Sequence, residues 1–278
     1  TKIENRILQD FFSSEEDIKY VSKYFSCASK MKDEPILKKN NNSMDIANSS
    51  MSYFLPYNKS KMEGDIWLKE HFRCQTPIVA ISNEISYFNE IIPLKKDKYK
   101  DKTWSTLLFM NHENKKHSNN TNPGEVEEII DFIKDRKDRY INEFLKVIKE
   151  EDGVQSQITD EDYYNSIGII TPFVNQENLL KERIKTELGH SSKNQYEPII
   201  KVGTVHKYQG SERDIIIFSS VYNSESKDKA HNLFFNRDEP DMINVAVTRA
   251  KEVFILFGNR NTISHPKTFS GTMVKHID

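Results

Sequence analysis

The sequence has only two cysteines among 278 residues, Cys27 and Cys74, and they lie far apart. So few thiols exclude a disulfide-stabilised secreted fold and a cysteine-based zinc module. Long hydrophobic runs and a signal-peptide pattern are also missing. These absences predict a cytoplasmic protein with no membrane segment. We expect Cys74 to be a small buried side chain rather than a nucleophile.

The sequence also has no large excess of positive or negative charge. The 40 lysines and arginines nearly balance the 42 aspartates and glutamates, which gives a formal net charge of −2 at pH 7. This balance excludes a global electrostatic attraction to nucleic acid, so any such binding must come from a local groove.

A third absence concerns phosphate binding. The sequence has no GxxxxGK(S/T) loop, and no acidic metal-binding motif follows a predicted strand. The chain therefore lacks the loop amides, the lysine and the metal-binding carboxylate that together cradle the β- and γ-phosphates of a nucleotide. Its histidines and acidic residues do not have the spacing of metal ligands, so we expect no metal site.

Short runs that are nearly continuous in apolar residues are present, mostly in the last third of the chain. They span residues 103–110, 167–171, 199–205, 215–219 and 253–257. Helical patterns at 176–188 and 241–250 lie between them. The sequence therefore predicts an α/β fold, a parallel sheet with helices on both faces. Because ligands of such sheets bind beyond the carboxyl ends of the strands, we expect functional residues there.

The rest of the chain is predicted to be largely helical. Residues 1–66 are predicted to be mostly helical and polar, and residues 67–278 to form a single larger domain. A turn at Pro77 leads into a helix, and residues 111–165 are predicted to be a charged helical insertion. Alternating charges in this insertion favour a solvated face over an arm that grips nucleic acid.

A basic stretch follows the Pro77 helix. It comprises Lys95, Lys96, Lys98, Lys100 and Lys102, with Tyr99 and Trp104 nearby. Such a mixture could contact a nucleic-acid backbone and stack on bases, but a flexible surface loop is the favoured interpretation.

Four segments carry the polar residues that chemistry requires. They read WLKEHFRCQTPIVAISNEISY at 67–87, IITPFVNQ at 169–176, VGTVHKYQGSERDIIIFS at 202–219 and NVAVTRAK at 244–251. Their order and spacing resemble the C-terminal half of superfamily 1 helicases of the Upf-like, 5′-to-3′ branch. NRILQDFF and SMDIANSSM, nearer the start of the chain, resemble the linker of a bacterial subgroup.

The resemblance implies the second RecA-like motor domain, of P-loop NTPase fold, of an ATP-dependent helicase. ATP and Mg²⁺ would be held mainly by a first RecA-like domain that this sequence lacks, so we expect the chain alone to be inactive. Thr1 is not preceded by Met, so we expect a fragment of a longer chain. The alternative is a catalytically inactive RecA-like interaction module.

The resemblance also assigns residues to the nucleotide. Arg73 and Arg249 occupy the family's two arginine-finger positions, where a guanidinium stabilises the charge that develops on the γ-phosphoryl group. The alternative for each is a surface arginine paired with a carboxylate. Phe72 stands where the family has an aromatic residue near the base, although a core aromatic is nearly as good an interpretation.

Two further groups of candidates follow. Gln209, Gly210 and Glu212 would form a turn that faces the nucleotide, where glycine suits a positive φ; the alternative is a simple capping turn. Thr171, Thr204 and His206 would contact single-stranded DNA, or RNA, without reading its sequence. His206 is equally compatible with a structural role. The other histidines, His112 among them, are predicted to lie on the solvated surface.

Overall fold

The computed structural model describes residues 69–95, 105–113, 119–141, 145–146, 158–223, 241–264 and 268–277. The chain divides into two compact units, and all of these residues belong to the second unit, Lys69–Asp278. The predicted linker, residues 1–66, lies outside the described residues.

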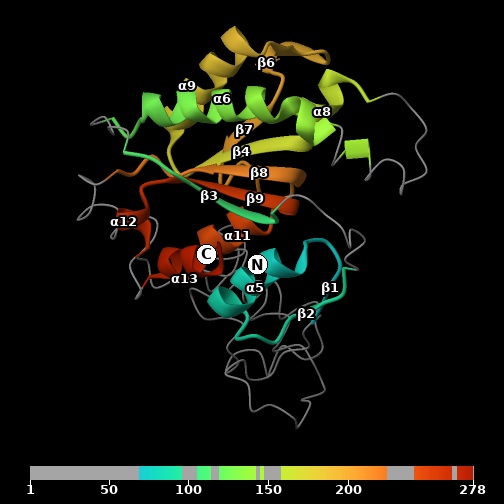
Figure 1. The fold of residues 1–278 in the computed structure, drawn as a ribbon, viewed down its shortest axis with the longest axis vertical. Coiled ribbons are helices and arrows are strands. Elements are labelled where there is room, and N and C mark those ends of the chain that lie inside the picture. The colour runs from blue at the N-terminus through green and yellow to red at the C-terminus, as the bar shows by residue number, and fades with distance from the viewer. Residues whose placement is uncertain are drawn as a thin grey trace, which may run out of the picture. The chain divides into compact units, whose positions relative to one another are not determined.

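One parallel sheet of five strands forms the centre of this unit (Figure 1), with the strand order β3–β9–β8–β4–β7. The strands are β3 (Leu107–Asn111), β4 (Ile167–Thr171), β7 (Lys201–Thr204), β8 (Arg213–Ser219) and β9 (Ala250–Gly258). Every residue of β4 is buried. The near-continuous apolar runs thus mark strands that are covered on both faces.

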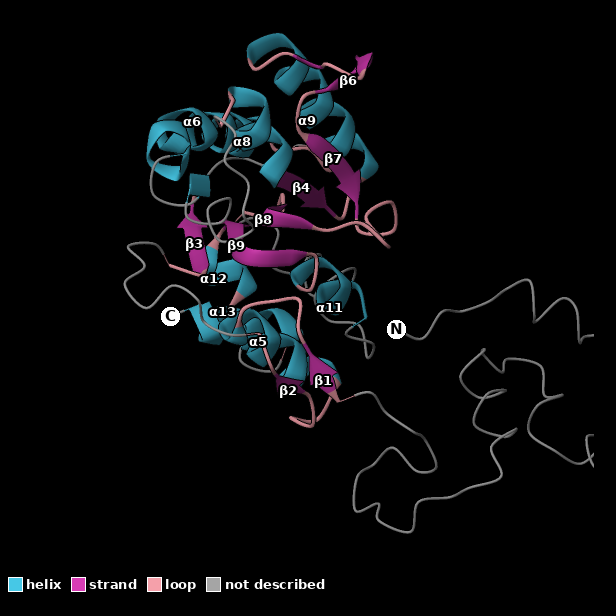
Figure 2. Cartoon of the chain, turned by 90° about the vertical axis from the view of Figure 1, so that its right-hand side faces the viewer, coloured by secondary structure: helices cyan, strands magenta, loops and turns pink. Residues whose placement is uncertain are grey.

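Helices cover both faces of the sheet (Figure 2). On one face lie α6 (Pro123–Tyr140), α8 (Asp160–Ser166) and α9 (Val174–Glu187); on the other lie α5 (Thr76–Ser86), α11 (Asp241–Val247) and α13 (Phe269–Ile277). A short helix, α12 (Arg260–Ile263), follows β9. The predicted α/β class with a parallel sheet and two helical layers is confirmed.

Successive side chains along each strand point to opposite faces of the sheet and so contribute to two hydrophobic cores. In β9, Val253, Ile255 and Phe257 pack towards α6, α8 and α9, whereas Phe254 and Leu256 pack towards α5, α11 and α13. This is the period of two that an extended strand imposes on its side chains. The sheet is therefore a rigid platform, and its two ends are the places where loops carry polar residues.

The helix α6 lies in the region that we predicted to be a charged insertion. Its residues Ile129, Ile130 and Ile133 are fully buried in the core on that face, so this helix is an integral layer of the fold. None of the helices in the described ranges is long and apolar enough to cross a membrane.

Two small pairs of strands were not predicted. β1 (Glu70–His71) pairs in parallel with β2 (Ile92–Pro93), and β5 (His190–Ser191) pairs in antiparallel fashion with β6 (Asn194–Pro198). β1, β2 and β5 have two residues each and β6 is almost wholly polar, so none of them carries the apolar pattern from which strands are predicted. The β1–β2 pair matters because it anchors the loop that leads into α5.

Candidate functional site

Arg249 lies in the turn between α11 and β9, and its side chain is largely buried, with 8% exposed. Its Nε donates to Val245 O at 3.1 Å, Nη1 to Ser211 O at 3.4 Å and Nη2 to Thr248 Oγ1 at 3.3 Å. These acceptors are carbonyl and hydroxyl oxygens, so the bonds orient the guanidinium without neutralising its charge.

Arg73 lies in the loop between β1 and α5. Its Nε lies 2.9 Å from Glu212 Oε2, and both side chains are close to half exposed. This contact is the ion pair that the alternative interpretation of Arg73 predicts. Such an exposed pair contributes only about 0–1 kcal/mol, so it leaves Arg73 able to exchange its partner for another anion.

The two arginines share one electrostatic environment. Burial is the largest effect that lowers the pKa of Arg249, and the nearby charge of Arg73 is the next, while Glu212 acts in the opposite direction. The loop of Arg73 is tied to that of Arg249, since Gln75 N donates to Lys251 O at 3.0 Å. Two guanidinium groups beside one carboxylate leave a local excess of positive charge, which suits an anionic ligand.

This cluster lies at the amino ends of the strands, not at the carboxyl ends where we expected functional residues. Arg213 begins β8 and pairs with Ala250 at the start of β9, so Glu212 and Arg249 both precede their strands. Our expectation was wrong for these residues for a topological reason. The connection from β7 to β8 holds no helix and returns directly from the carboxyl end to the amino end.

That connection contains the predicted nucleotide turn. Gly210 has a φ of +82°, which confirms the positive φ that we predicted. Gln209, Gly210 and Glu212 are exposed. Phe72 is 64% exposed, so its interpretation as a core aromatic is wrong. Phe72 precedes Arg73 in its loop, and the exposed turn reaches both arginines, since Glu212 pairs with Arg73 and Ser211 O accepts from Arg249.

Tyr208, which sequence reasoning did not single out, anchors this connection to the sheet. It is fully buried, and its hydroxyl donates to Lys201 O at 2.8 Å. A Cβ on Gly168 would lie only 2.3 Å from that hydroxyl oxygen. An aromatic residue inside an otherwise polar turn, facing a glycine in a strand, is the signal that could have revealed it.

The nucleic-acid candidates lie at the carboxyl ends of the strands, opposite the arginine cluster. Thr171 and Thr204 end β4 and β7 and are partners in the register of those strands. Thr171 is fully buried and its Oγ1 accepts from Phe173 N at 3.5 Å, while Thr204 is nearly buried. His206 follows on the exposed connection. The structure thus brings the two threonines together, and only His206 of the three has an exposed side chain.

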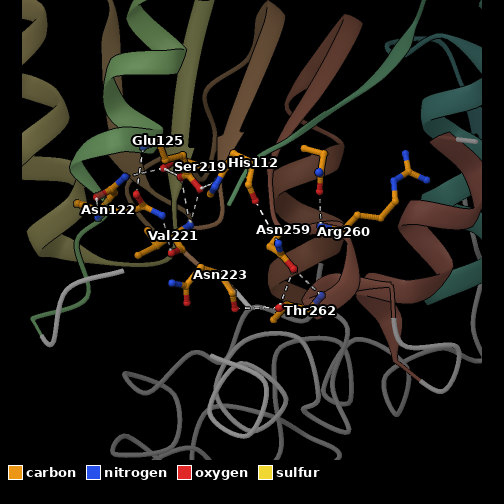
Figure 3. Close-up of polar contacts among 11 residues, drawn as sticks. His112, Asn122, Glu125, Ser219, Val221, Asn223, Asn259, Arg260 and Thr262 are labelled. Atoms are coloured by element: carbon orange, nitrogen blue, oxygen red, sulfur yellow. Dashed lines mark hydrogen bonds and ion pairs between the residues drawn. The ribbon is translucent and has the colours of Figure 1, made fainter. Parts of the chain in front are cut away.

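Sequence reasoning missed a buried polar network at the carboxyl ends of the strands (Figure 3). The Glu125 carboxylate is fully buried, accepts from Ser219 Oγ and from Val221 N at 3.1 Å, and lies 2.5 Å from His112 Nε2. His112 is therefore buried, and its predicted place on the solvated surface was wrong. Asn122 caps α6 by accepting from Glu125 N at 3.1 Å.

The same network ties together the segments that follow four strands, β3, β4, β8 and β9, among them the first turn of α9. Gln176, after β4, donates to Ser219 Oγ at 3.0 Å, and Asn259, after β9, donates to His112 O at 3.1 Å. Asn122 followed three residues later by Glu125 has the spacing of a capping box, and this was the available signal. The network fixes the loops that surround Thr171.

The donor set at the arginine cluster fits a phosphate group. Its cations are guanidinium groups, whereas its carboxylates, Glu212 and Glu252, already pair with Arg73 and Lys95. Within the described ranges no group of three or more histidine, cysteine or acidic side chains is arranged to hold a metal ion. The cluster thus has the chemistry of an anion site.

Comparisons with known proteins agree with these motifs. The profile of the AAA_12 family, described as an AAA domain, matches residues 49–261, well over half of the chain. The sequence is 29% identical over 209 residues to the putative helicase mov-10-B.1 of Danio rerio, which covers 69% of this chain and 19% of that protein.

Two relatives from Schizosaccharomyces pombe match over shorter stretches. Helicase sen1 is 36% identical over 112 residues, covering 40% of this chain and 6% of that protein. The DNA replication ATP-dependent helicase/nuclease dna2 is 35% identical over 113 residues, covering 41% and 7%. The chain spans no more than a fifth of the length of these curated relatives.

Proposed function

This chain belongs to the AAA_12 family and is a C-terminal RecA-like domain of the superfamily 1 helicases, and from that premise we propose that it supplies arginine fingers to an ATP-driven motor. In this proposal it is the second motor domain of a helicase or translocase. The first RecA-like domain would hold most of the ATP and the Mg²⁺ ion.

The observation that carries the proposal is that Arg73 and Arg249 both contact one turn at the amino ends of the strands, through Glu212 and through the carbonyl of Ser211. ATP hydrolysis spreads negative charge over the γ-phosphoryl oxygens, and a guanidinium presented from the facing domain stabilises that charge. Arg249 is already oriented and partly desolvated, so little reorganisation is needed when the domains close. Glu212 holds Arg73 until the phosphate replaces it.

The proposed polymer is single-stranded nucleic acid that lies across the carboxyl ends of the strands, opposite the arginine cluster. The exposed imidazole of His206 would contact it, and Thr171 and Thr204, whose side chains are buried here, would lie beneath it at the carboxyl ends of β4 and β7. Among the relatives, one is named a DNA replication helicase/nuclease and another a probable RNA helicase from Drosophila melanogaster. We propose DNA, because the early segments resemble the linker of a bacterial helicase subgroup.

Steady-state ATP hydrolysis tests this function. We expect the purified chain to release no phosphate above the blank, because it lacks a phosphate loop. A protein that joins this domain to its phosphate-loop domain should hydrolyse ATP, and single-stranded DNA should stimulate it more than single-stranded RNA of the same length.

A different result would contradict each part of this expectation. Turnover by the chain alone would contradict the division of labour between two domains. A joined protein that binds nucleic acid without hydrolysing ATP would favour the inactive interaction module. Stronger stimulation by RNA would overturn the preference for DNA.

A further inference from the structure

Lys95 is a buried cation beside the arginine cluster. Its side chain is only 14% exposed, and its ammonium group donates to Arg73 O at 3.0 Å, to Lys251 O at 2.9 Å and to the Glu252 carboxylate. A flexible surface loop was the favoured interpretation of the basic stretch that begins here. For Lys95 it was wrong, and residues 96–104, with the rest of the stretch, lie outside the described residues.

Glu252 completes a closed network with Lys95 and Gln75. Its second carboxylate oxygen accepts from Gln75 Nε2 at 2.7 Å, and Gln75 N donates to Lys251 O at 3.0 Å. Gln75 and Glu252 are both buried. Five hydrogen bonds thus link the loop before α5, Lys95 after β2 and the start of β9, and the bond between the Gln75 and Glu252 side chains is buried.

The network acts on the backbone next to both proposed arginine fingers. Lys95 binds the carbonyl of Arg73 itself, and Lys251 lies two residues after Arg249. The Arg73 side chain is half exposed and its ion pair with Glu212 is weak, so its side chain alone cannot fix its position. The backbone that Lys95 holds therefore sets the point from which the Arg73 side chain extends.

We propose that Lys95 and Glu252 are positioning residues, which hold Arg73 and Arg249 at one fixed spacing so that both guanidinium groups meet the same phosphoryl group. This inference rests on the proposed function. Geometry of this kind matters for rate, because a displacement of about 1 Å in a reacting group lowers turnover by as much as about 100-fold.

A double variant, Lys95→Met with Glu252→Gln, tests the proposal in the protein that contains both motor domains. It removes both charges together, so no uncompensated charge is left buried. The matched control is Lys134→Met with Glu187→Gln, which removes a more exposed ion pair of 2.7 Å between α6 and α9, on the face of the sheet opposite α5 and α11.

We expect the kcat for ATP of the test variant to fall between about tenfold and about 100-fold. Its KM for ATP should stay within about twofold, because the first domain binds the nucleotide. The control should keep both constants within about twofold. An unchanged kcat in the test variant, or a KM that rises while kcat is retained, would overturn the positioning role.

The second readout is whether the effects of Arg73→Ala and of the double variant on kcat are additive, as they would be if the network had a purely structural role. Arg73→Ala should lower kcat strongly in the wild-type background and much less in the test variant, where Arg73 is already displaced. Equal fold-losses in the two backgrounds would overturn the proposal. If the double variant does not fold, as judged by its thermal transition, Glu252→Gln alone is measured in the same way, because it keeps the shape of the side chain.

The proposed function and the positioning role fail in different ways. If Arg249→Ala leaves turnover unchanged, the finger function itself is wrong. If Arg249→Ala abolishes turnover while the Lys95 and Glu252 variants retain full kcat, the fingers stand and only their positioning by this network is wrong.

Discussion

Replacing Arg249 with alanine is expected to lower ATP turnover by the two-domain protein about a thousandfold or more. The substitution removes a guanidinium that the fold has already oriented through Val245 O, Ser211 O and Thr248 Oγ1. None of those bonds neutralises its charge, so the charge remains for the γ-phosphoryl group. Phosphate release at saturating ATP and saturating single-stranded DNA measures the effect.

Two comparisons make this result specific. Arg183→Ala removes a partly exposed arginine of α9 that pairs with Glu187, and it should leave turnover within about twofold of the wild type. Arg249→Lys keeps the charge but loses the planar fork of donors, so it should restore only a small part of the rate. A folded Arg249→Ala variant with near-normal turnover would rule out the finger role.

Replacing Glu125 with alanine is expected to lower the free energy of unfolding of the domain by about 3–5 kcal/mol. The change leaves His112, Ser219 Oγ and Val221 N buried without their carboxylate acceptor. Val221 has a φ of +72°, which is strained for a β-branched residue, and the Glu125 carboxylate holds its amide there. Urea denaturation of the isolated domain measures the loss.

The control for this prediction is on the same helix. Glu127 is 60% exposed and lies 3.6 Å from Arg183, so Glu127→Ala should change the free energy of unfolding by no more than about 0.5 kcal/mol. A Glu125→Ala loss as small as that of Glu127→Ala would mean that the buried network does not hold the carboxyl-edge loops together.

The sheet is the part of the fold that the sequence predicts best. The predicted range 167–171, the second strand of the sheet in chain order, is the range of β4. The strand β8 begins two residues earlier than predicted, at Arg213, because ladder hydrogen bonds extend over polar residues as readily as apolar ones. Continuous apolar runs therefore predict where the strands lie. The first and last residue of each strand depend on backbone pairing, which composition does not encode.

The candidate site was only partly predictable. The motifs identified Arg73 and Arg249 one by one, and the positive φ of Gly210 followed from the turn it occupies. The resemblance implied that both arginines meet one phosphate, but the general rule for α/β sheets pointed to the carboxyl ends of the strands, whereas they lie at the amino ends. Lys95 was interpreted as part of a surface loop and Glu125 was not singled out, because their partners, Glu252 and Ser219, lie far away in sequence and meet them only in the folded chain.

The most direct test of the central claim is a crystal structure of the two-domain protein with Mg²⁺, ADP and an aluminium fluoride that mimics the transferred phosphoryl group. We predict that the guanidinium groups of Arg73 and Arg249 both lie within hydrogen-bond distance of the fluoride, about 2.7–3.2 Å. Arg73 should then have left Glu212, its partner in the present structure. A bound mimic with Arg73 still paired to Glu212, and with Arg249 directed away from the fluoride, would contradict the account.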